Sequence, residues 1–177
     1  MTTARSVEII ALPQARPPEL LRQTLGVWPL PGLSLLAETR QTLTALCVRQ
    51  PPFTMPPGSP LMAATARRVE VVFTELAGNA LRHAQQPIRV HLASTAKAWL
   101  IGVDDAAPEL TPMVGTLEGD QPGGRGLAIV LSLASSAGWY VTDGIKTVWA
   151  EVPDRPPAEL LERLRHRRPG FSRTLEA

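Results

Sequence analysis

The sequence predicts an α+β fold, a two-layer sandwich in which helices cover one face of an antiparallel or mixed sheet. Two observations support this class. Apolar residues recur at helical spacing in several segments, and two pairs of strand-like runs are each joined by a short polar turn. Strict alternation of strand and helix is absent, so a doubly wound parallel sheet is not expected.

The composition suits a single globular domain with extensions. Of the 177 residues, 44% are hydrophobic and 19% are charged. We expect a Pro-rich N-terminal extension over residues 1–33, a folded domain over 34–153, and a basic tail over 154–177. The lone cysteine, Cys47, excludes an internal disulfide and a multi-cysteine metal site, and is expected to be a small buried hydrophobe.

The charge pattern gives little support for nucleic-acid or membrane binding. The net charge is only +2, and six of the sixteen arginines lie between residues 155 and 173, where Glu159 and Glu162 indicate a solvated helix. The longest uncharged apolar stretch, residues 23–37, is broken by prolines and shorter than the roughly 20 residues that span a bilayer. No signal peptide is visible, so we expect a soluble, cytoplasmic protein.

The first third of the chain is expected to hold few regular elements. Residues 6–12 could form a short strand, and residues 19–25 a short helix within a Pro- and Gly-rich stretch. Ser34 could cap a helix that runs to about residue 49. Five prolines and a glycine in residues 50–60 then predict a loop.

The strongest helix prediction covers residues 61–84, which Pro87 follows. Its apolar positions share one face at the spacing i, i+3, i+4, i+7, i+11. They are Val69, Val72, Phe73, Leu76 and Ala80. Two alternating runs, residues 88–93 and 98–103, then predict an antiparallel hairpin.

The second half is expected to repeat the order of loop, helix and hairpin. Residues 104–123 have little periodicity and indicate a long loop, which in a compact domain is usually functional. A helix is expected over residues 126–137, with Gly138 as its stop. Asp143-Gly144 predicts a turn between strands 139–142 and 146–152, and a short basic helix is expected over 158–168.

Glu75, Asn79 and His83 are spaced i, i+4, i+8 on the long helix, so they share one face. A carboxylate and an amide on one face can hold a divalent cation and a water, because Mg²⁺ prefers oxygen ligands. A solvated face would carry the same residues, and His83 could serve only the helix dipole. Spacing alone leaves these interpretations open.

Asp104 and Asp105 end an apolar strand. Acidic residues at such a position often begin a turn by bonding their own backbone. The alternative is a carboxylate that is fixed at the sheet edge and accepts a hydrogen bond from a ligand amine.

Residues 123–127 read Gly-Gly-Arg-Gly-Leu, directly before a predicted helix. Glycines let the backbone approach an anion closely, and a helix N-terminus offers free N–H groups. Arg125 adds a fixed charge. The pattern is typical of a phosphate site, but ordinary turns also use glycine, and it matches neither the P-loop nor the dinucleotide-binding fingerprint.

Taken in chain order, these three groups resemble the Bergerat ATP-binding fold of the histidine-kinase-like ATPases, and in particular the anti-sigma-factor serine/threonine kinases. The resemblance covers about residues 35–152. The matching motifs are Glu75-Leu76-x-x-Asn79-Ala80-x-x-His83, Asp105-x-x-Pro108, Gly124-x-Gly126-Leu127 and Lys146-Thr147-Val148-Trp149-Ala150. One departure is Ala106, which stands where the larger family commonly has glycine.

The resemblance implies a role for each matching residue. Asn79 would bind a Mg²⁺ ion that bridges the ATP phosphates, and Glu75 would act as general base toward the attacking hydroxyl. Asp105 would accept from the adenine amine, with Thr147 in support. Residues 109–122 would form an ATP lid, and the phosphate end would be lined by Gly124, Arg125, Gly126 and Leu127.

The implied function is an ATP- and Mg²⁺-dependent protein serine/threonine kinase that phosphorylates a protein antagonist and binds a sigma factor. The alternative is a non-catalytic, ATP-dependent protein-interaction module, because Glu75 can be retained without a kinase substrate. A third interpretation is a structural domain without nucleotide. Four tryptophans and the dimerising habit of the family favour a homodimer, and neither nucleic acid nor membrane is an expected partner.

Overall fold

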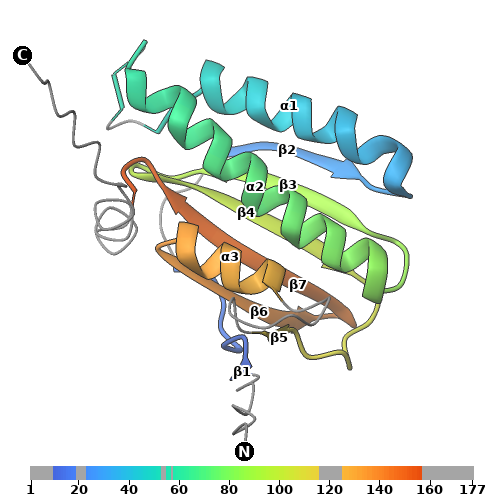
Figure 1. Ribbon diagram of the computed structural model, residues 1–177. Coiled ribbons are helices and arrows are strands. Elements are labelled where there is room, and N and C mark those ends of the chain that lie inside the picture. The colour runs from blue at the N-terminus through green and yellow to red at the C-terminus, as the bar shows by residue number, and fades with distance from the viewer. Residues whose placement is uncertain (1–9, 19–22, 53–54, 57, 116–124, 157–177) are drawn as a thin grey trace, which may run out of the picture.

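A computed structural model describes residues 10–18, 23–52, 55–56, 58–115 and 125–156 of the chain. In these residues three α-helices form one layer and a five-stranded sheet forms the other (Figure 1). The helices are α1 (Leu36–Arg49), α2 (Pro60–His83) and α3 (Arg125–Leu133), and a 3-10 turn, Leu33–Leu35, precedes α1. The predicted two-layer α+β class is confirmed. None of the helices described is long and apolar enough to cross a membrane.

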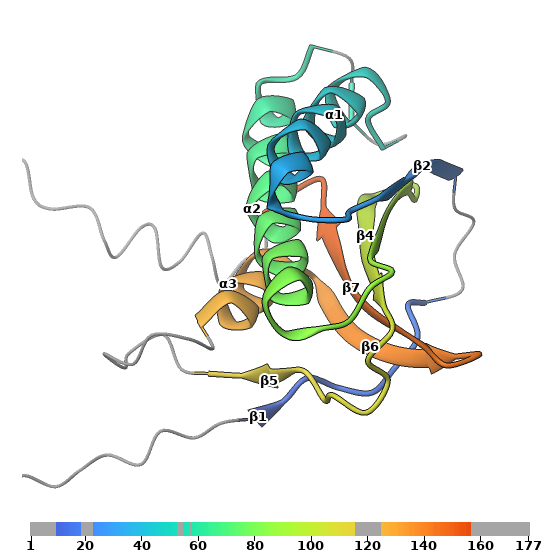
Figure 2. The same ribbon diagram turned by 90° about the vertical axis from the view of Figure 1, so that its right-hand side faces the viewer.

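The sheet has the strand order β2-β3-β4-β7-β6, and every neighbouring pair is antiparallel. The strands are β2 (Gln23–Pro29), β3 (Arg89–Ser94), β4 (Ala98–Asp105), β6 (Ser136–Thr142) and β7 (Ile145–Pro153). Two short strands, β1 (Ile10–Ala11) and β5 (Met113–Val114), pair with each other beside the sheet (Figure 2). Both expected hairpins are present, and Asp143 and Gly144 take the positive φ values, 51° and 76°, of a type I′ turn.

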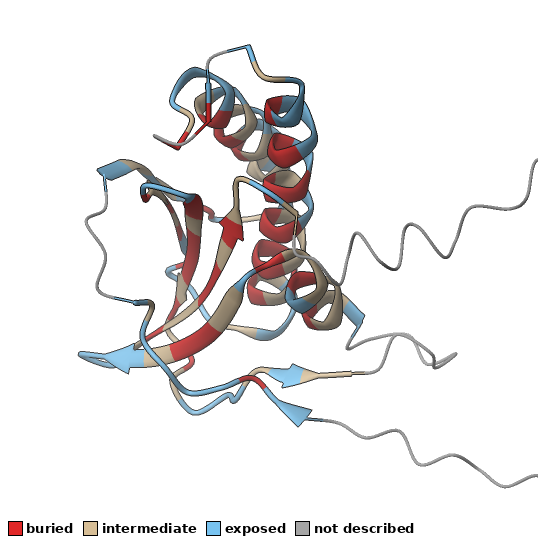
Figure 3. Cartoon of the chain, turned by 90° about the vertical axis from the view of Figure 1, so that its left-hand side faces the viewer, coloured by how far each residue is buried: buried red, intermediate tan, exposed pale blue. Residues whose placement is uncertain are grey.

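The long helix α2 crosses the sheet and supplies the centre of the core. The Oγ of Ser59 accepts from the N–H of Leu61 at 3.3 Å, and Pro60 stands at the helix start, where its missing N–H breaks no helical bond. The side of α2 that faces the sheet is buried (Figure 3). It carries the predicted apolar face, of which Val72 and Phe73 have no exposed surface. Each such side chain contributes about 1.5–3 kcal/mol through removal of apolar area from water.

Two segments differ from the elements expected at their positions. Residues 23–25, expected to end a short helix, belong to β2, because ladder bonds to β3 decide the conformation rather than local preference. The helix expected over residues 126–137 ends at Leu133, and Gly138 lies inside β6 instead of stopping a helix. The chain turns there because Ser135 N donates to the Glu151 carbonyl oxygen at 2.8 Å and starts the pairing of β6 with β7.

Other expected boundaries differ less. Ser34 lies inside the 3-10 turn, and Leu35 occupies the N-cap position of α1. Of the strand expected over residues 6–12, only Ile10–Ala11 is seen as strand, and residues 6–9 lie outside the described part of the chain. The basic helix expected over residues 158–168 also lies outside it.

Residues 12–15, here called the N-terminal strap, are fastened to the sheet edge (Figure 2). Leu12 is buried, and its carbonyl oxygen accepts from Trp139 Nε1 at 3.0 Å. Trp149 Nε1 donates to the carbonyl oxygen of Ala15 at 2.7 Å, and Leu12 N donates to that of Pro112 at 2.9 Å. The strap and β2 thus belong to the folded unit, while the domain limits at residues 33 and 153 stay predictions.

We expect Gly138→Ala to destabilise the protein by about 1–3 kcal/mol, the usual cost of overpacking. A Cβ on Gly138 would lie 3.0 Å from the carbonyl oxygen of Pro13 and 3.1 Å from that of Ala15, so the strap would have to move. Urea denaturation measures the loss. Gly102→Ala in β4 of the same sheet is the matched control, since its nearest contact is an ordinary 3.5 Å to Thr147 Cγ2. Equal stability of the two variants would contradict the close packing of the strap.

Cys47 has no exposed surface and lies on the face of α1 that meets the core. Burial raises the pKa of its thiol to about 12, so the reactive thiolate is suppressed at neutral pH. The structure therefore confirms the expected role as a small buried hydrophobe.

Candidate functional site

A cavity of about 530 Å³ opens between the C-terminal half of α2, the ends of β4 and β7, and the segment before β5. Its volume is typical of a small-molecule site, about 300–1,000 Å³. Most of the wall is apolar, with Leu76, Val103 and Val148 among its residues. The polar side chains that line it are those of Asn79, His83, Asp105, Thr111 and Lys146.

Asp105, the last residue of β4, is the buried carboxylate of this cavity, with 2% of its surface exposed. Its Oδ1 accepts from Ala107 N at 2.9 Å and lies 3.3 Å from Lys146 Nζ. Burial raises the pKa of Asp105 above its ordinary value, although the Ala107 bond and the Lys146 charge act in the opposite direction. Because both contacts fall on Oδ1, Oδ2 is the atom that could accept from a ligand amine.

Lys146, near the start of β7, bonds to the end of β4 and to the turn after it, which lines the cavity. Its Nζ donates to the carbonyl oxygen of Ala107 at 3.0 Å and to that of Leu110 at 2.9 Å, in addition to its ion pair with Asp105. The residue is only 5% exposed. Residues 107–110 are thereby held against the start of β7.

Glu75, Asn79 and Gly126 meet where α2 approaches the first turn of α3. A Cβ on Gly126 would overlap Glu75 Oε2 and would lie 3.6 Å from Asn79 Nδ2, so glycine leaves room for both side chains. Asn79 lines the cavity, and its Oδ1 accepts from Arg82 Nη2 at 2.9 Å. An amide and a helix N-terminus, which can bind phosphate, therefore lie together at one end of the site, with the Glu75 carboxylate beside them.

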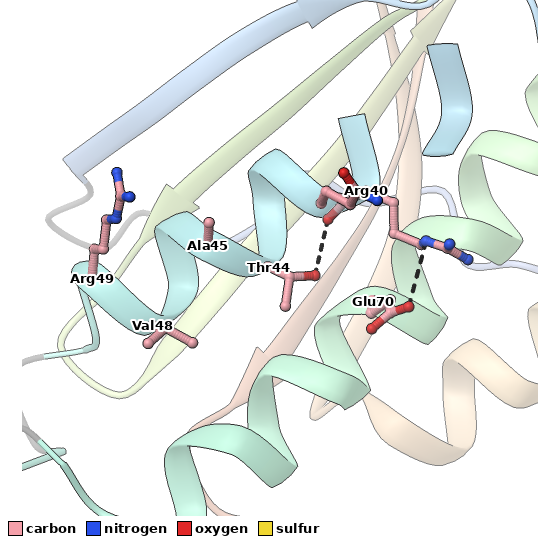
Figure 4. A pocket seen from close by; sticks show the side chains of 7 residues that line it. Arg40, Thr44, Ala45, Val48, Arg49 and Glu70 are labelled. Carbon is pink, nitrogen blue, oxygen red and sulfur yellow. Dashed lines mark hydrogen bonds and ion pairs between the residues drawn. The ribbon is translucent and has the colours of Figure 1, made fainter. Parts of the chain in front are cut away.

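A second hollow, of about 460 Å³, lies on the surface of α1 (Figure 4). Two of its three charged side chains pair with each other, since Arg40 Nε lies 3.4 Å from Glu70 Oε1. Thr44 Oγ1 donates to the carbonyl oxygen of Arg40 at 2.9 Å, a bond within the helix. The side chains of the Arg40–Glu70 pair are half-exposed, and no buried charged group comparable to Asp105 lies among the residues that line this hollow.

The model of the histidine kinase-like ATPase domain family matches residues 56–151, more than half of the chain. The chain belongs to this family. No curated protein matches it. Among solved structures it is similar to the histidine kinase AdeS of Acinetobacter baumannii, with 15% identity and a TM-score of 0.38 over 77% of this chain and 69% of that one.

Membership in the histidine kinase-like ATPase family implies ATP binding, and the cavity fits that ligand. An acceptor carboxylate stands at one end, apolar walls suit a base and a ribose, and the start of α3 stands at the other. Among the described residues no group of three or more His, Cys, Asp or Glu side chains could hold a metal. Asn79 offers an amide oxygen, of the oxygen type that Mg²⁺ prefers, although in this structure that Oδ1 accepts from Arg82 Nη2.

The expected support of Asp105 by Thr147 is wrong. Side chains alternate along a strand, so Thr147 faces away from the helices while Lys146 and Val148 face the ATPase cavity. Thr147 Oγ1 donates to Asp104 Oδ1 at 2.7 Å in a separate cleft of about 490 Å³ on the open face of the sheet. Of the two neighbouring acids, Asp105 lines this cavity and Asp104 lines the cleft on the open face.

On the open face, Asp104 belongs to a polar network. Its Oδ2 pairs with His91 Nε2, and its Oδ1 accepts from Thr147. Burial raises the pKa of Asp104, but these hydrogen bonds and the charges of His91 and Arg89 outweigh it, so the pKa lies below its ordinary value. Nearby, the guanidinium of Arg16 stacks on Tyr140 at 4.6 Å.

The glycine-rich segment of the ATPase domain is described only in part. Leu127 is buried and lines the cavity, Gly126 lies beside Glu75, and Arg125 is exposed at the start of α3. Gly124 lies outside the described residues, as do residues 116–122 of the expected ATP lid. Of the described part of that lid, residues 110–113 line the cavity, and Met113–Val114 form β5.

Lys146 is the site residue that the sequence reasoning did not single out. A signal was present, because strand alternation places it on the same side as the apolar Val148, Ala150 and Val152. A lysine on a buried face needs acceptors to compensate its charge, which points to a partner inside the fold.

Proposed function

We propose that this ATPase domain is a protein serine/threonine kinase of the anti-sigma-factor type. It transfers the γ-phosphate of ATP to a hydroxyl of a protein antagonist and also binds a sigma factor, in the cytoplasm and as a homodimer. Nucleic acid and membrane are not direct partners. The observation that supports this most is the grouping of Asn79 and Asp105 in one cavity, with Glu75 at the start of α3.

Each residue has a role that its surroundings can serve. Asp105 accepts from the exocyclic amine of adenine, and the start of α3, with Arg125, Gly126 and Leu127, faces the phosphates. Gly124 completes that end by resemblance. Glu75 accepts the proton of the attacking hydroxyl. Phosphoryl transfer needs positioning and charge neutralisation more than covalent chemistry, so this small set of groups is sufficient.

Asn79→Ala is expected to abolish the Mg²⁺ dependence of ATP binding and to lower the affinity measured in Mg²⁺, because Mg²⁺ is held by few protein oxygen ligands besides the phosphates and water. Calorimetric titration of ATP with Mg²⁺ and with a chelator measures the difference. Arg82→Ala is the matched control, since it frees Asn79 Oδ1 without removing the ligand and should keep the dependence. Full Mg²⁺ dependence in Asn79→Ala would contradict this assignment.

The kinase activity is tested by transfer of labelled γ-phosphate from ATP to candidate antagonist proteins, followed by mass spectrometry of the product. We expect a phosphoserine or phosphothreonine on one antagonist. Tight ATP binding without transfer to any candidate would instead support the alternative function, a non-catalytic ATP-dependent interaction module. One contact favours that alternative, since Arg82 engages Asn79 Oδ1, the atom that a Mg²⁺ ion would need.

A further inference from the structure

The Lys146 ammonium lies among three acceptors inside the cavity wall. They are the carbonyl oxygens of Ala107 and Leu110, at 3.0 and 2.9 Å, and Asp105 Oδ1, at 3.3 Å. An ammonium group has three N–H bonds, so these acceptors match its donors one for one. The side chains of Lys146 and Asp105 are 6% and 3% exposed, so this ion pair is shielded from water.

These contacts join parts of the chain that are far apart in sequence. Asp105 and Lys146 stand opposite each other in the register of β4 and β7, whereas Ala107 and Leu110 belong to the turn that follows β4. Leu110 itself lines the cavity. Loss of the ammonium would leave two carbonyl oxygens and one carboxylate oxygen without that donor, which costs more than a bond exposed to water.

We propose that Lys146 is the positioning residue of the adenine site, which fixes Asp105 through Oδ1 and holds the 107–110 turn, so that Oδ2 alone is presented to the base. Lys146 itself touches no part of the nucleotide. This inference rests on the proposed role of Asp105 in adenine recognition. Under this inference, the contact of Lys146 with Asp105 Oδ1 sets both the affinity for ATP and its pH dependence.

Several ionisable groups surround Asp105 and bear on its charge. Lys146 faces it from β7, and His83 faces the same cavity from α2. Asp104 precedes it and points to the open face of the sheet, and Glu109 in the following turn is exposed. Lys146 is the cation in direct contact, so its removal leaves a buried carboxylate that protonates more readily.

The first test compares ATP affinity in Lys146→Met, Lys146→Arg and Lys97→Met by calorimetry between about pH 4 and 8, a range that reaches the titration of carboxyl groups at its lower end and of imidazole groups above it. Lys97 is the other lysine of the chain, and it is exposed, so its variant is the matched control. Lys146→Met is expected to lose about 10–150-fold in affinity, the range of a charge-assisted hydrogen bond, and to bind best at higher pH than wild type. Lys146→Arg keeps the charge and should restore the pH profile.

All variants are also made with His83→Gln, which removes the imidazole as a source of pH dependence. Unchanged affinity and profile in Lys146→Met would overturn the inference, and so would tighter binding, which would mean that Lys146 blocks the base. A shifted profile in Lys97→Met would also overturn it, because a general charge effect would then explain the result. If the wild-type protein binds no ATP, both the proposed function and this inference are wrong. If it binds ATP but Lys146→Met changes nothing, only this inference is wrong.

A second test uses the wild-type chain, so it does not depend on the folding of a variant. Reductive methylation labels lysine amines, and peptide mass spectrometry reads Lys97 and Lys146 separately. We expect fast labelling of Lys97, slow labelling of Lys146, and further protection of Lys146 alone by ATP. Equal rates for the two lysines would overturn the inference.

Discussion

Glu75→Gln is expected to slow phosphate transfer by about 10²- to 10⁴-fold, the usual contribution of a general base. The amide keeps the size of the side chain, so it still fits beside Gly126, but it cannot accept the proton of the attacking hydroxyl. ATP affinity should stay close to that of wild type, because Glu75 is not among the residues that line the cavity. Single-turnover transfer with a phosphorylatable antagonist, together with calorimetry, separates the two effects.

Glu70→Gln is the matched control for this variant. Glu70 lies on the same helix but pairs with Arg40 of α1, away from the cavity (Figure 4). The control should transfer phosphate at the wild-type rate, since a surface ion pair of this kind affects stability by about 0–1 kcal/mol. Transfer by Glu75→Gln at the rate of Glu70→Gln would contradict the general-base role.

Asp105→Asn is expected to weaken ATP binding by about 10–150-fold, the value of a hydrogen bond to a charged acceptor. In asparagine, an NH₂ donor replaces one of the two carboxylate oxygens. It faces either the amine of the base or the Lys146 ammonium, and in both cases two buried donors face each other without an acceptor. Calorimetric titration of ATP measures the change. Asp104→Asn is the matched control, since that carboxylate bonds Thr147 on the open face of the sheet.

The pH dependence of ATP binding adds an independent check. Burial raises the pKa of Asp105, so a fall in pH protonates this carboxyl earlier than a solvated one and lowers ATP affinity in that window. The pKa of Asp104 is shifted down, so its protonation occurs at lower pH and cannot produce the same loss. Asp104→Asn should therefore keep the wild-type profile, and Asp105→Asn should flatten it. The opposite pattern would assign adenine recognition to the neighbouring acid.

Much of the fold could be predicted because its signals are local. The apolar stripe of α2 follows helical periodicity, and Asp143-Gly144 specifies a type I′ turn, so both elements are visible in short windows of sequence. β2 could not be predicted, because Gln23–Pro29 lacks a clean alternation and becomes a strand only through its ladder with β3. The end of α3 was misplaced for the same reason, since pairing of Ser136 with Glu151 decides where β6 begins.

The order of motifs in the sequence predicted some of the residues that line the candidate site, but not all of them. Asn79 and Asp105 line one cavity, and their roles toward ATP stay predictions. Thr147 was misassigned because its place in a motif says nothing about which side of β7 it faces. Lys146 was part of a matching motif but received no role, because two of its acceptors are backbone carbonyls of a turn far away in sequence.

The most direct test of the central claim is a crystal structure of the full chain with Mg²⁺ and a non-hydrolysable ATP analogue. We expect the adenine amine within hydrogen-bond distance of Asp105 Oδ2, with Lys146 still on Oδ1, and the phosphates at the start of α3 beside Asn79. A nucleotide bound in the cleft on the open face, or a base that makes no contact with Asp105, would contradict the account.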